Sequence, residues 1–244
     1  MLRKVLAFAF LLVMVSASVS FAAPVPPAKG QWAWPLESSL RLYEKADRYS
    51  EYSTVKMPAK WLSVPSAVRD DDNYLWYKVS VNGKTGWLPQ NGIRLKMGGK
   101  SKSASNLYKN YVKARNKIMS KPGDWSRDND DGTITYTSDD GEFRVIRGKK
   151  SVEDLYFQTS DGDICKQFFG VDLIGMYQSD LRKKLGTPTM RETPFEDPEI
   201  SVLSFELADR NMTLSITERR DDGDDEGHVI TVDLHKGRTG EFED

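Results

Sequence analysis

The chain has 244 residues, with 35 Lys or Arg against 36 Asp or Glu, so its formal net charge is −1. This balance is not typical of proteins that bind nucleic acid or a membrane surface through bulk charge. Cys165 is the only cysteine, which excludes an internal disulfide, so the fold has to rely on hydrophobic cores and hydrogen bonds.

The first residues have the pattern of a secretory signal peptide. Arg3 and Lys4 precede an apolar run at residues 5–15, and small residues then lead to Ser20 and Ala22. The run is shorter than the roughly 20 residues that a membrane span needs. We therefore expect residues 1–22 to be removed, which changes the charge from −1 to −3 through the loss of two cations. The mature protein is expected in the periplasm, outside the cell or on the cell wall, without an integral membrane segment.

Composition divides the mature chain into two parts. Residues 23–30 are proline-rich and are expected to form an extended leader, and residues 98–103 (GGKSKS) have the composition of a linker. Residues 31–97 hold ten Lys or Arg against seven Asp or Glu, whereas residues 104–244 hold 20 against 29. Two domains are therefore predicted, the first slightly basic and the second acidic.

Short strands dominate the pattern of the first domain. Asn82-Gly83 lies between two apolar-patterned runs and is a strong signal for a hairpin, because both residues tolerate a positive φ. Residues 69–73 (RDDDN) are expected to form a solvated loop. The predicted strands are Leu40–Tyr43, Lys60–Val64, Leu75–Val81 and Lys84–Leu88.

The run W-Y-K-V-S-V-N-G-K-T-G-W-L at residues 76–88 resembles the distal hairpin of bacterial SH3 domains. The resemblance extends over about residues 31–97 and implies a small closed β-barrel. In exported bacterial proteins such barrels commonly bind cell-wall peptide or target the protein to its site.

A peptide groove on this barrel is the main candidate site. SH3-like grooves are ridges of aromatic side chains that receive extended peptides. By resemblance to the eukaryotic pattern, Tyr43, Trp76 and Pro89 are candidate groove residues, and Trp87 of the hairpin is the fourth candidate. Two positions depart from that pattern, since Lys45 and Gly92 stand where it has further tyrosines, and this argues against polyproline as the ligand. The alternative is that these aromatic residues pack the barrel.

The second domain has an α+β pattern. Leu107, Tyr111, Ala114 and Ile118 form an amphipathic helical stripe that Ser105 could cap, and Leu181 with Leu185 marks a second helix that ends at Gly186. The last three of the predicted strands should form a meander, which gives the order helix, strands, helix, meander. The predicted strands are Thr133–Thr137, Phe143–Arg147, Asp154–Thr159, Ile164–Phe169, Val202–Leu207, Met212–Thr217 and Val229–Leu234.

The run G-M-Y-Q-S-D-L-R-K-K-L-G-T-P at residues 175–188, followed by the meander, is similar to a signature of exported modules of the SmpA/OmlA and β-lactamase-inhibitor-protein type. The resemblance covers one helix. It implies a non-catalytic domain that presents a sheet face to other proteins.

Two further constellations give alternative functions. Cys165 with His228 or His235 could serve a cell-wall cysteine peptidase, although the run around Cys165 alternates like a strand and lacks the helix start that activates a thiolate. Asp222, Asp224 and Glu226 have the spacing of a calcium loop, but strands flank them where the calcium loop needs helices. A solvated hairpin tip is the simpler interpretation.

The sequence therefore predicts a mainly β plus α+β protein: an SH3-like barrel followed by an α+β domain with a helix-flanked antiparallel sheet. No catalytic residue, metal or cofactor is assigned. The function expected is an exported, non-catalytic binding protein that recognises cell-wall peptide or an envelope protein and has an acidic interaction domain.

Overall fold

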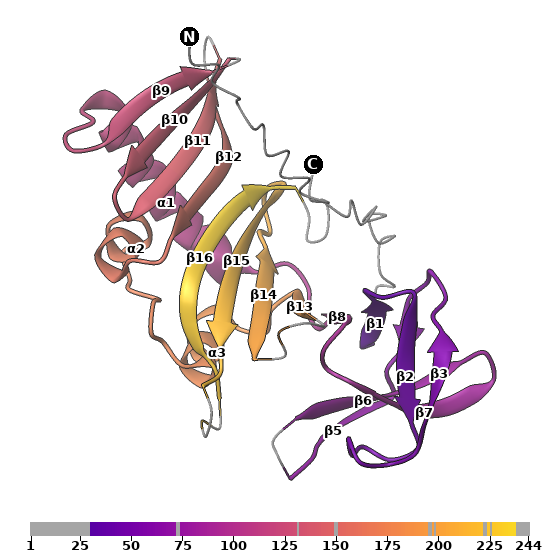
Figure 1. Cartoon of the computed structure of the whole chain (residues 1–244). Coiled ribbons are helices and arrows are strands. Elements are labelled where there is room, and N and C mark those ends of the chain that lie inside the picture. Colours follow the sequence, from indigo (N-terminus) through magenta and orange to yellow (C-terminus); the bar gives the residue numbers. More distant parts are fainter. Residues whose placement is uncertain are drawn as a thin grey trace, which may run out of the picture.

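A computed structural model shows a protein built mostly of antiparallel strands (Figure 1). The part of the chain up to residue 97 is here called the first half and the part after it the second half, and the described helices all lie in the second half. The structure describes residues 30–71, 74–130, 132–148, 151–194, 197, 199–221, 224 and 226–237. Within these ranges no helix combines the length and the apolar character that a membrane span requires. The β-rich α+β class predicted from the sequence is confirmed.

The first half consists of short strands divided between two sheets. One sheet has the order β3-β2-β7-β6-β5, while β4, β1 and β8 belong to the large sheet that continues into the second half. The expected closed barrel is not found among the described residues. The strands are β1 (Trp32–Pro35), β2 (Ser39–Tyr43), β3 (Tyr52–Lys56), β4 (Leu62–Ser63), β5 (Ser66–Arg69), β6 (Leu75–Val81), β7 (Lys84–Pro89) and β8 (Ile93–Lys96).

The hairpin of β6 and β7 forms as the sequence predicts. Asn82 and Gly83 have φ values of 52° and 81°, the left-handed conformation that a two-residue hairpin turn needs. Val81 pairs with Lys84, and the ladder continues to Trp76 opposite Pro89. Tyr77 and Val79 on one face of β6 join a core that also contains Ala33 of β1, so the two sheets of this half share one apolar interior.

The second half is a large antiparallel sheet with helices on one side (Figure 1). The eleven-stranded order is β4-β1-β8-β13-β14-β15-β16-β12-β11-β10-β9 among the described residues. The three last strands form the predicted meander, with β13 added in front of them. The elements are α1 (Lys102–Ser120), β9 (Ser126–Asp130), β10 (Thr133–Ser138), β11 (Gly141–Arg147), β12 (Val152–Thr159), α2 (Gly162–Phe169), α3 (Gln178–Leu185), β13 (Met190–Thr193), β14 (Ile200–Glu206), β15 (Met212–Arg219) and β16 (His228–Lys236).

Helix α1 starts one turn earlier than the sequence suggested. Its N-cap is Ser101, whose Oγ accepts a hydrogen bond from the Ala104 backbone N–H at 3.1 Å, and not Ser105. Ser105 lies inside the first turn, and its hydroxyl donates to the Ser101 carbonyl. The buried stripe accordingly includes Tyr108 as well as Tyr111 and Ile118.

The predicted strand at Ile164–Phe169 is wrong, because this segment is helix α2. Asp161 caps its start by accepting from the Ile164 backbone N–H at 2.8 Å. Cys165, Phe168 and Phe169 lie at the spacing of one helical face and are all buried. In a run of only eight residues, alternating apolar residues fit either period, and the cap at Asp161 decides for the helix.

The two halves are joined by strand pairing as well as by the chain. β8 pairs with β13 over four residues, with Leu95 opposite Arg191. Ser101, in the segment predicted as a linker, donates its backbone N–H to the Glu206 carbonyl at 2.7 Å. Residues that lie about a hundred positions apart therefore meet at a junction between the halves, and the domain boundaries themselves stay a prediction.

Candidate functional site

The main candidate site lies on the outer face of the five-stranded sheet. The alternation of side chains along β2 places residues on this face. Leu40 and Leu42 point into the core of the first half, so Arg41 and Tyr43 lie on the opposite face. On β6 and β7 the same face carries Trp76 and Pro89, which are directly paired in the ladder.

An aromatic floor is formed where these strands meet. The ring of Tyr43 contacts that of Trp76 edge to face, with centroids 5.1 Å apart and an interplanar angle of 80°. Only 1 % of Trp76 and 8 % of Tyr43 are exposed. Neither belongs to the apolar core of this half. These two rings therefore form a separate aromatic cluster on the face of the sheet that is turned away from the core.

Asp70 fixes the orientation of the indole. Its Oδ2 accepts a hydrogen bond from Trp76 Nε1 at 2.8 Å, and its Oδ1 accepts one from the Tyr74 backbone N–H at 2.8 Å. The sequence predicted residues 69–73 as a solvated loop. That interpretation is wrong at its start, because Arg69 ends β5 and Asp70 holds Trp76. Residues 72–73 lie outside the described residues.

Above this floor is a cleft of about 400 Å³, here called the aromatic cleft. Its rim has a cationic side, made by the exposed side chains Arg41 and Arg48, and Asp70 is the acidic residue among those that line it. Both oxygens of Asp70 already accept hydrogen bonds, so Asp70 is held to the tryptophan. The residues lining the cleft are Ser39, Leu40, Arg41, Tyr43, Arg48, Thr54, Asp70, Tyr74, Trp76, Pro89 and Asn91.

Three of the four candidate groove residues therefore come together, namely Tyr43, Trp76 and Pro89. Trp87 is half-buried on the same face, two pairs further along the ladder opposite Lys78, and does not line the cleft. The Lys78 ammonium lies 5.7 Å from the centre of its ring.

Sequence reasoning missed Arg41 and Tyr74 of the cleft. For Arg41 a signal was present, since the alternation of Leu40 and Leu42 in β2 already sends the residue between them to the outer face. Tyr74 lies at the end of a loop, where no periodicity predicts the direction of a side chain.

The cysteine-peptidase alternative requires a reactive thiolate, and Cys165 does not have its surroundings. The side chain is fully buried among the aromatic residues of the second core. Its Sγ contacts the Val171 carbonyl at 3.6 Å and the Leu173 backbone N–H at 3.4 Å. Burial raises the pKa of the thiol to about 11. A thiol in this state is protonated at neutral pH and is not a nucleophile.

The two histidines lie elsewhere. His235 Nε2 is 3.0 Å from the Ser215 hydroxyl on the neighbouring strand, and burial lowers the pKa of its ring. His228 Nδ1 is 3.9 Å from an Asp221 carboxylate oxygen. No described contact joins either ring to Cys165, so the structure does not bring the proposed catalytic residues together.

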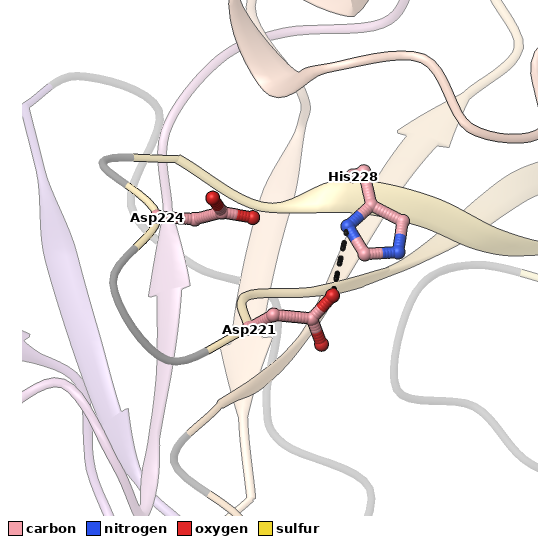
Figure 2. A group of neighbouring side chains, drawn as sticks. All are labelled: Asp221, Asp224 and His228. Carbon is pink, nitrogen blue, oxygen red and sulfur yellow. Dashed lines mark ion pairs between the residues drawn. The ribbon is translucent and has the colours of Figure 1, made fainter.

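The acidic hairpin between β15 and β16 was the candidate calcium site. Glu226 does not face an ion there, since its two carboxylate oxygens accept from the backbone N–H and the hydroxyl of Ser179 at 2.8 and 2.9 Å. Asp222 lies outside the described residues. Asp224 lies near Asp221 and His228, with one ligand atom of each within 4.8 Å of the others (Figure 2). Asp221 also contacts Arg219 at 3.7 Å, so this exposed group is partly neutralised by the protein.

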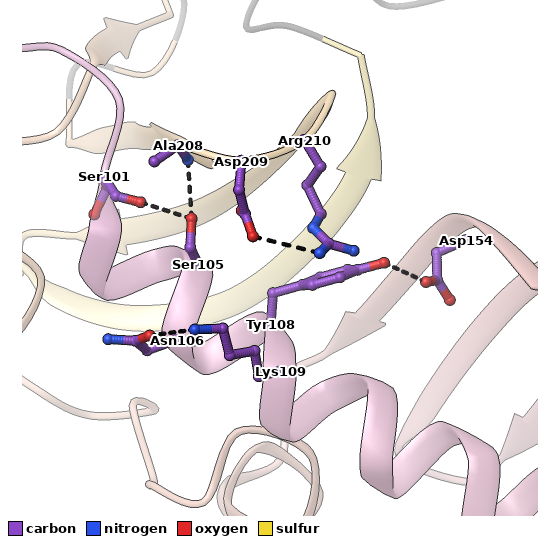
Figure 3. Close-up of polar contacts among 9 residues, drawn as sticks. All are labelled: Ser101, Ser105, Asn106, Tyr108, Lys109, Asp154, Ala208, Asp209 and Arg210. Carbon is purple, nitrogen blue, oxygen red and sulfur yellow. Dashed lines mark hydrogen bonds and ion pairs between the residues drawn. The ribbon is translucent and has the colours of Figure 1, made fainter.

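A buried ionic cluster lies beneath α1, and its two opposite charges are in direct contact. Arg115 and Asp154 form an ion pair of 2.5 Å, and only 4 % and 2 % of their side chains are exposed. Tyr108 donates its hydroxyl to the same carboxylate at 2.5 Å, and the Arg210 guanidinium lies 4.4 Å from the centre of its ring (Figure 3). These contacts join α1 to β12 and to the β14–β15 turn. We call this set the α1 cluster.

Comparison with protein-family models, with curated proteins and with solved structures found no match to this chain.

Proposed function

We propose that this chain is an exported binding protein whose first half is an SH3-like module that receives an extended peptide in the aromatic cleft. The ligand is cell-wall peptide or a segment of an envelope protein, and the acidic second half is an interaction domain. The resemblance of residues 76–88 to bacterial SH3 domains and the signal-like residues 1–22 support the proposal.

The observation that carries the proposal is the cleft itself. A volume of about 400 Å³ is within the usual range of roughly 300–1,000 Å³ for ligand pockets. Its floor is aromatic and is fixed by the bond from Trp76 to Asp70, so little order has to be created when a peptide binds. Fixed aromatic surfaces beside a strand are a common way to bind extended peptides.

The charge of the rim favours an anionic ligand. Arg41 is exposed and its guanidinium lies 4.7 Å from the centre of the Tyr52 ring, with no carboxylate within 4 Å in the described part of the chain. A peptide carboxylate could therefore pair with Arg41 while an apolar side chain lies on Trp76. Cell-wall peptides with free carboxylates and acidic segments of envelope proteins share this chemistry.

Retention on purified cell wall tests the proposal. The chain without residues 1–22 is incubated with insoluble wall, and the bound fraction is measured for the wild type, Arg41→Glu and Asn91→Ala. Trp76→Ala is a poor probe, because removing a buried tryptophan costs about 3–5 kcal/mol of folding free energy and confuses unfolding with lost binding. Lys84→Glu is the matched control, since it makes the same charge reversal at an exposed site at the far end of β7.

We expect Arg41→Glu to weaken retention about tenfold, corresponding to about 1.4 kcal/mol, and Asn91→Ala to weaken it less. Lys84→Glu should be retained like the wild type. Equal retention of Arg41→Glu, Asn91→Ala and the wild type would remove the cleft from the proposed function.

A further inference from the structure

A second, smaller cavity lies at the junction of the two halves, away from the aromatic cleft. Its lining residues come from both halves: Gln90 follows β7, Gln178 belongs to α3, and Arg191, Ser201 and Glu218 belong to β13, β14 and β15. Its volume is about 30 Å³. That is room for roughly two water molecules or one halide ion. We call it the junction cavity.

Arg191 is a buried cation without an opposite charge in contact. Its exposed fraction is 8 %, and its Nη2 donates to the Ser201 hydroxyl at 2.9 Å and to Gln90 Oε1 at 3.4 Å. Within the described ranges no carboxylate lies within 4 Å of it, and its Nε has no hydrogen-bond partner. A buried charge of this kind costs several kcal/mol unless something compensates it.

Other cations surround the cavity. Arg69 of β5 and Arg220 after β15 also line it. Burial lowers the pKa of the Arg69 guanidinium, and the positive charges of Arg191 and Arg220 lower it further. These arginines are therefore close enough to repel one another, and Arg182 of α3 adds to the same field. Three arginines therefore line this one small cavity.

Three acids also line the cavity among the described residues. Glu226 is bonded to Ser179, and Glu199 is half-exposed at the rim. Glu218 is the buried one: Gln178 Nε2 donates to its Oε2 at 2.6 Å, while its Oε1 has no hydrogen-bond partner among the described residues. Burial raises the pKa of Glu218 to about 7, against the opposing effects of Gln178, Arg191 and Arg182. This carboxyl is therefore about half protonated near pH 7 and mainly protonated at lower pH.

We propose that the junction cavity binds one small anion of halide size, with chloride as the physiological occupant, on Arg191 Nε and the Oε1–H of protonated Glu218. Both atoms are donors in that state, and an anion accepts from both. Arg191 also bonds to Gln90 of the first half, so the anion would lie beside a contact between the two halves. This proposal does not depend on the proposed function of the aromatic cleft.

Binding of the anion is coupled to the protonation of Glu218. An ionised Glu218 repels a halide, so the anion binds the protonated form. With a pKa of about 7, the apparent affinity should be about tenfold higher at pH 6 than at pH 8. The charged groups that act on the pKa of Glu218 are Arg191 of β13, Arg182 of α3 and Glu226 of the hairpin: the two arginines lower it and Glu226 raises it.

Bromide replaces chloride as the probe, since it scatters anomalously. Crystals of the full mature chain are soaked in sodium bromide at pH 6, and the anomalous difference map is calculated at the junction. We expect a peak within hydrogen-bonding distance of Arg191 Nε. A map with water density at this position and no anomalous peak at pH 6 would overturn the proposal.

Melting temperatures in solution give an independent measurement. At constant ionic strength, exchange of chloride for gluconate should lower the melting temperature of the wild type at pH 6, and less so at pH 8. Arg191→Gln should abolish the difference between the two salts. Arg94→Gln is the matched control: Arg94 is also buried, but it is paired with Glu192 at 2.7 Å, so this variant loses stability and keeps the response to chloride. A chloride response that survives in Arg191→Gln contradicts the assignment.

Discussion

The α1 cluster and the junction cavity are two buried sets of charge in one protein, and they differ in how the charge is compensated. Beneath α1, Arg115 forms an ion pair of 2.5 Å with Asp154, and two tyrosine hydroxyls donate hydrogen bonds to the same carboxylate. At the junction, Arg191 has only neutral partners in the described part of the chain. A buried charge that is paired with an opposite charge is compensated within the protein. A buried charge without such a partner points to a binding site for a ligand of opposite charge.

Removing the anion of the α1 cluster should give the largest effect. Asp154→Ala leaves Arg115 buried without an opposite charge and removes the acceptor of Tyr108 and Tyr111. We expect the free energy of unfolding to fall by about 3–5 kcal/mol, measured by urea denaturation. Glu153→Ala is the control, since the neighbouring Glu153 pairs with Lys236 at the surface and should contribute less than about 1 kcal/mol. A loss below about 1 kcal/mol for Asp154→Ala would contradict the comparison.

The apolar core of the second half should protect the Cys165 thiol from alkylating reagents. Its pKa of about 11 lies two units above the ordinary value of 9.0. The thiolate fraction at neutral pH is therefore about 100-fold lower than that of a free cysteine. Alkylation of the native protein should be slower by at least this factor, and denaturant should restore the normal rate. Rapid alkylation without denaturant would mean that the core opens to solvent and would revive the peptidase alternative.

Glu218 at the junction should make the stability of the protein depend on pH. The folded-state pKa of Glu218 is raised from 4.5 to about 7, so the folded state binds the proton more tightly than the unfolded state. The resulting stability is present in full below about pH 4.5 and is lost as the pH rises to about 7. In a chloride-free buffer the wild type should lose about 2–3 kcal/mol over this range.

Glu218→Gln should remove most of this pH dependence, as measured by urea denaturation at pH 5 and pH 8. Burial also raises the pKa of Asp233 to about 7, so Asp233→Asn serves as the comparison. Asp233 is only half-buried, and water weakens its contribution. If the pH dependence of the free energy of unfolding persists in Glu218→Gln and disappears in Asp233→Asn, Asp233 and not Glu218 causes it.

Much of the fold followed from local patterns. Asn82-Gly83 identified the hairpin correctly because its turn needs two residues that accept a positive φ, and that requirement is local. The helix at residues 178–185 ended at Gly186 as predicted, for a similar reason. The prediction of a strand at 164–169 was wrong because six residues are too few to separate a helical from a strand period.

The sites followed from the sequence less well, because they depend on contacts between distant residues. Tyr43, Trp76 and Pro89 were predicted through a resemblance to a family, whereas Arg41, which the resemblance does not include, was missed. The pairing of Arg191 with Gln90, 101 positions apart, has no local signal at all. A buried arginine without an acid can be recognised only once the strands are placed.

The role of Glu226, an acid of the hairpin between β15 and β16, also depends on a contact with a distant residue. Its substitution should have the smallest effect on the free energy of unfolding. Its spacing predicted a calcium ligand, but the structure uses it as a cap from outside the helix, because Tyr177 at the N-cap of α3 offers no side-chain acceptor. Glu226→Ala should lower the free energy of unfolding by about 1 kcal/mol, since a cap and a favourable charge at a helix start are both lost. Asp224→Ala, on the same hairpin, should change it by less than about 0.5 kcal/mol. Calcium should leave the melting temperature of the wild type unchanged, because an ion would have to draw Glu226 away from Ser179; a clear rise with calcium would show that the hairpin prefers the ion to the helix.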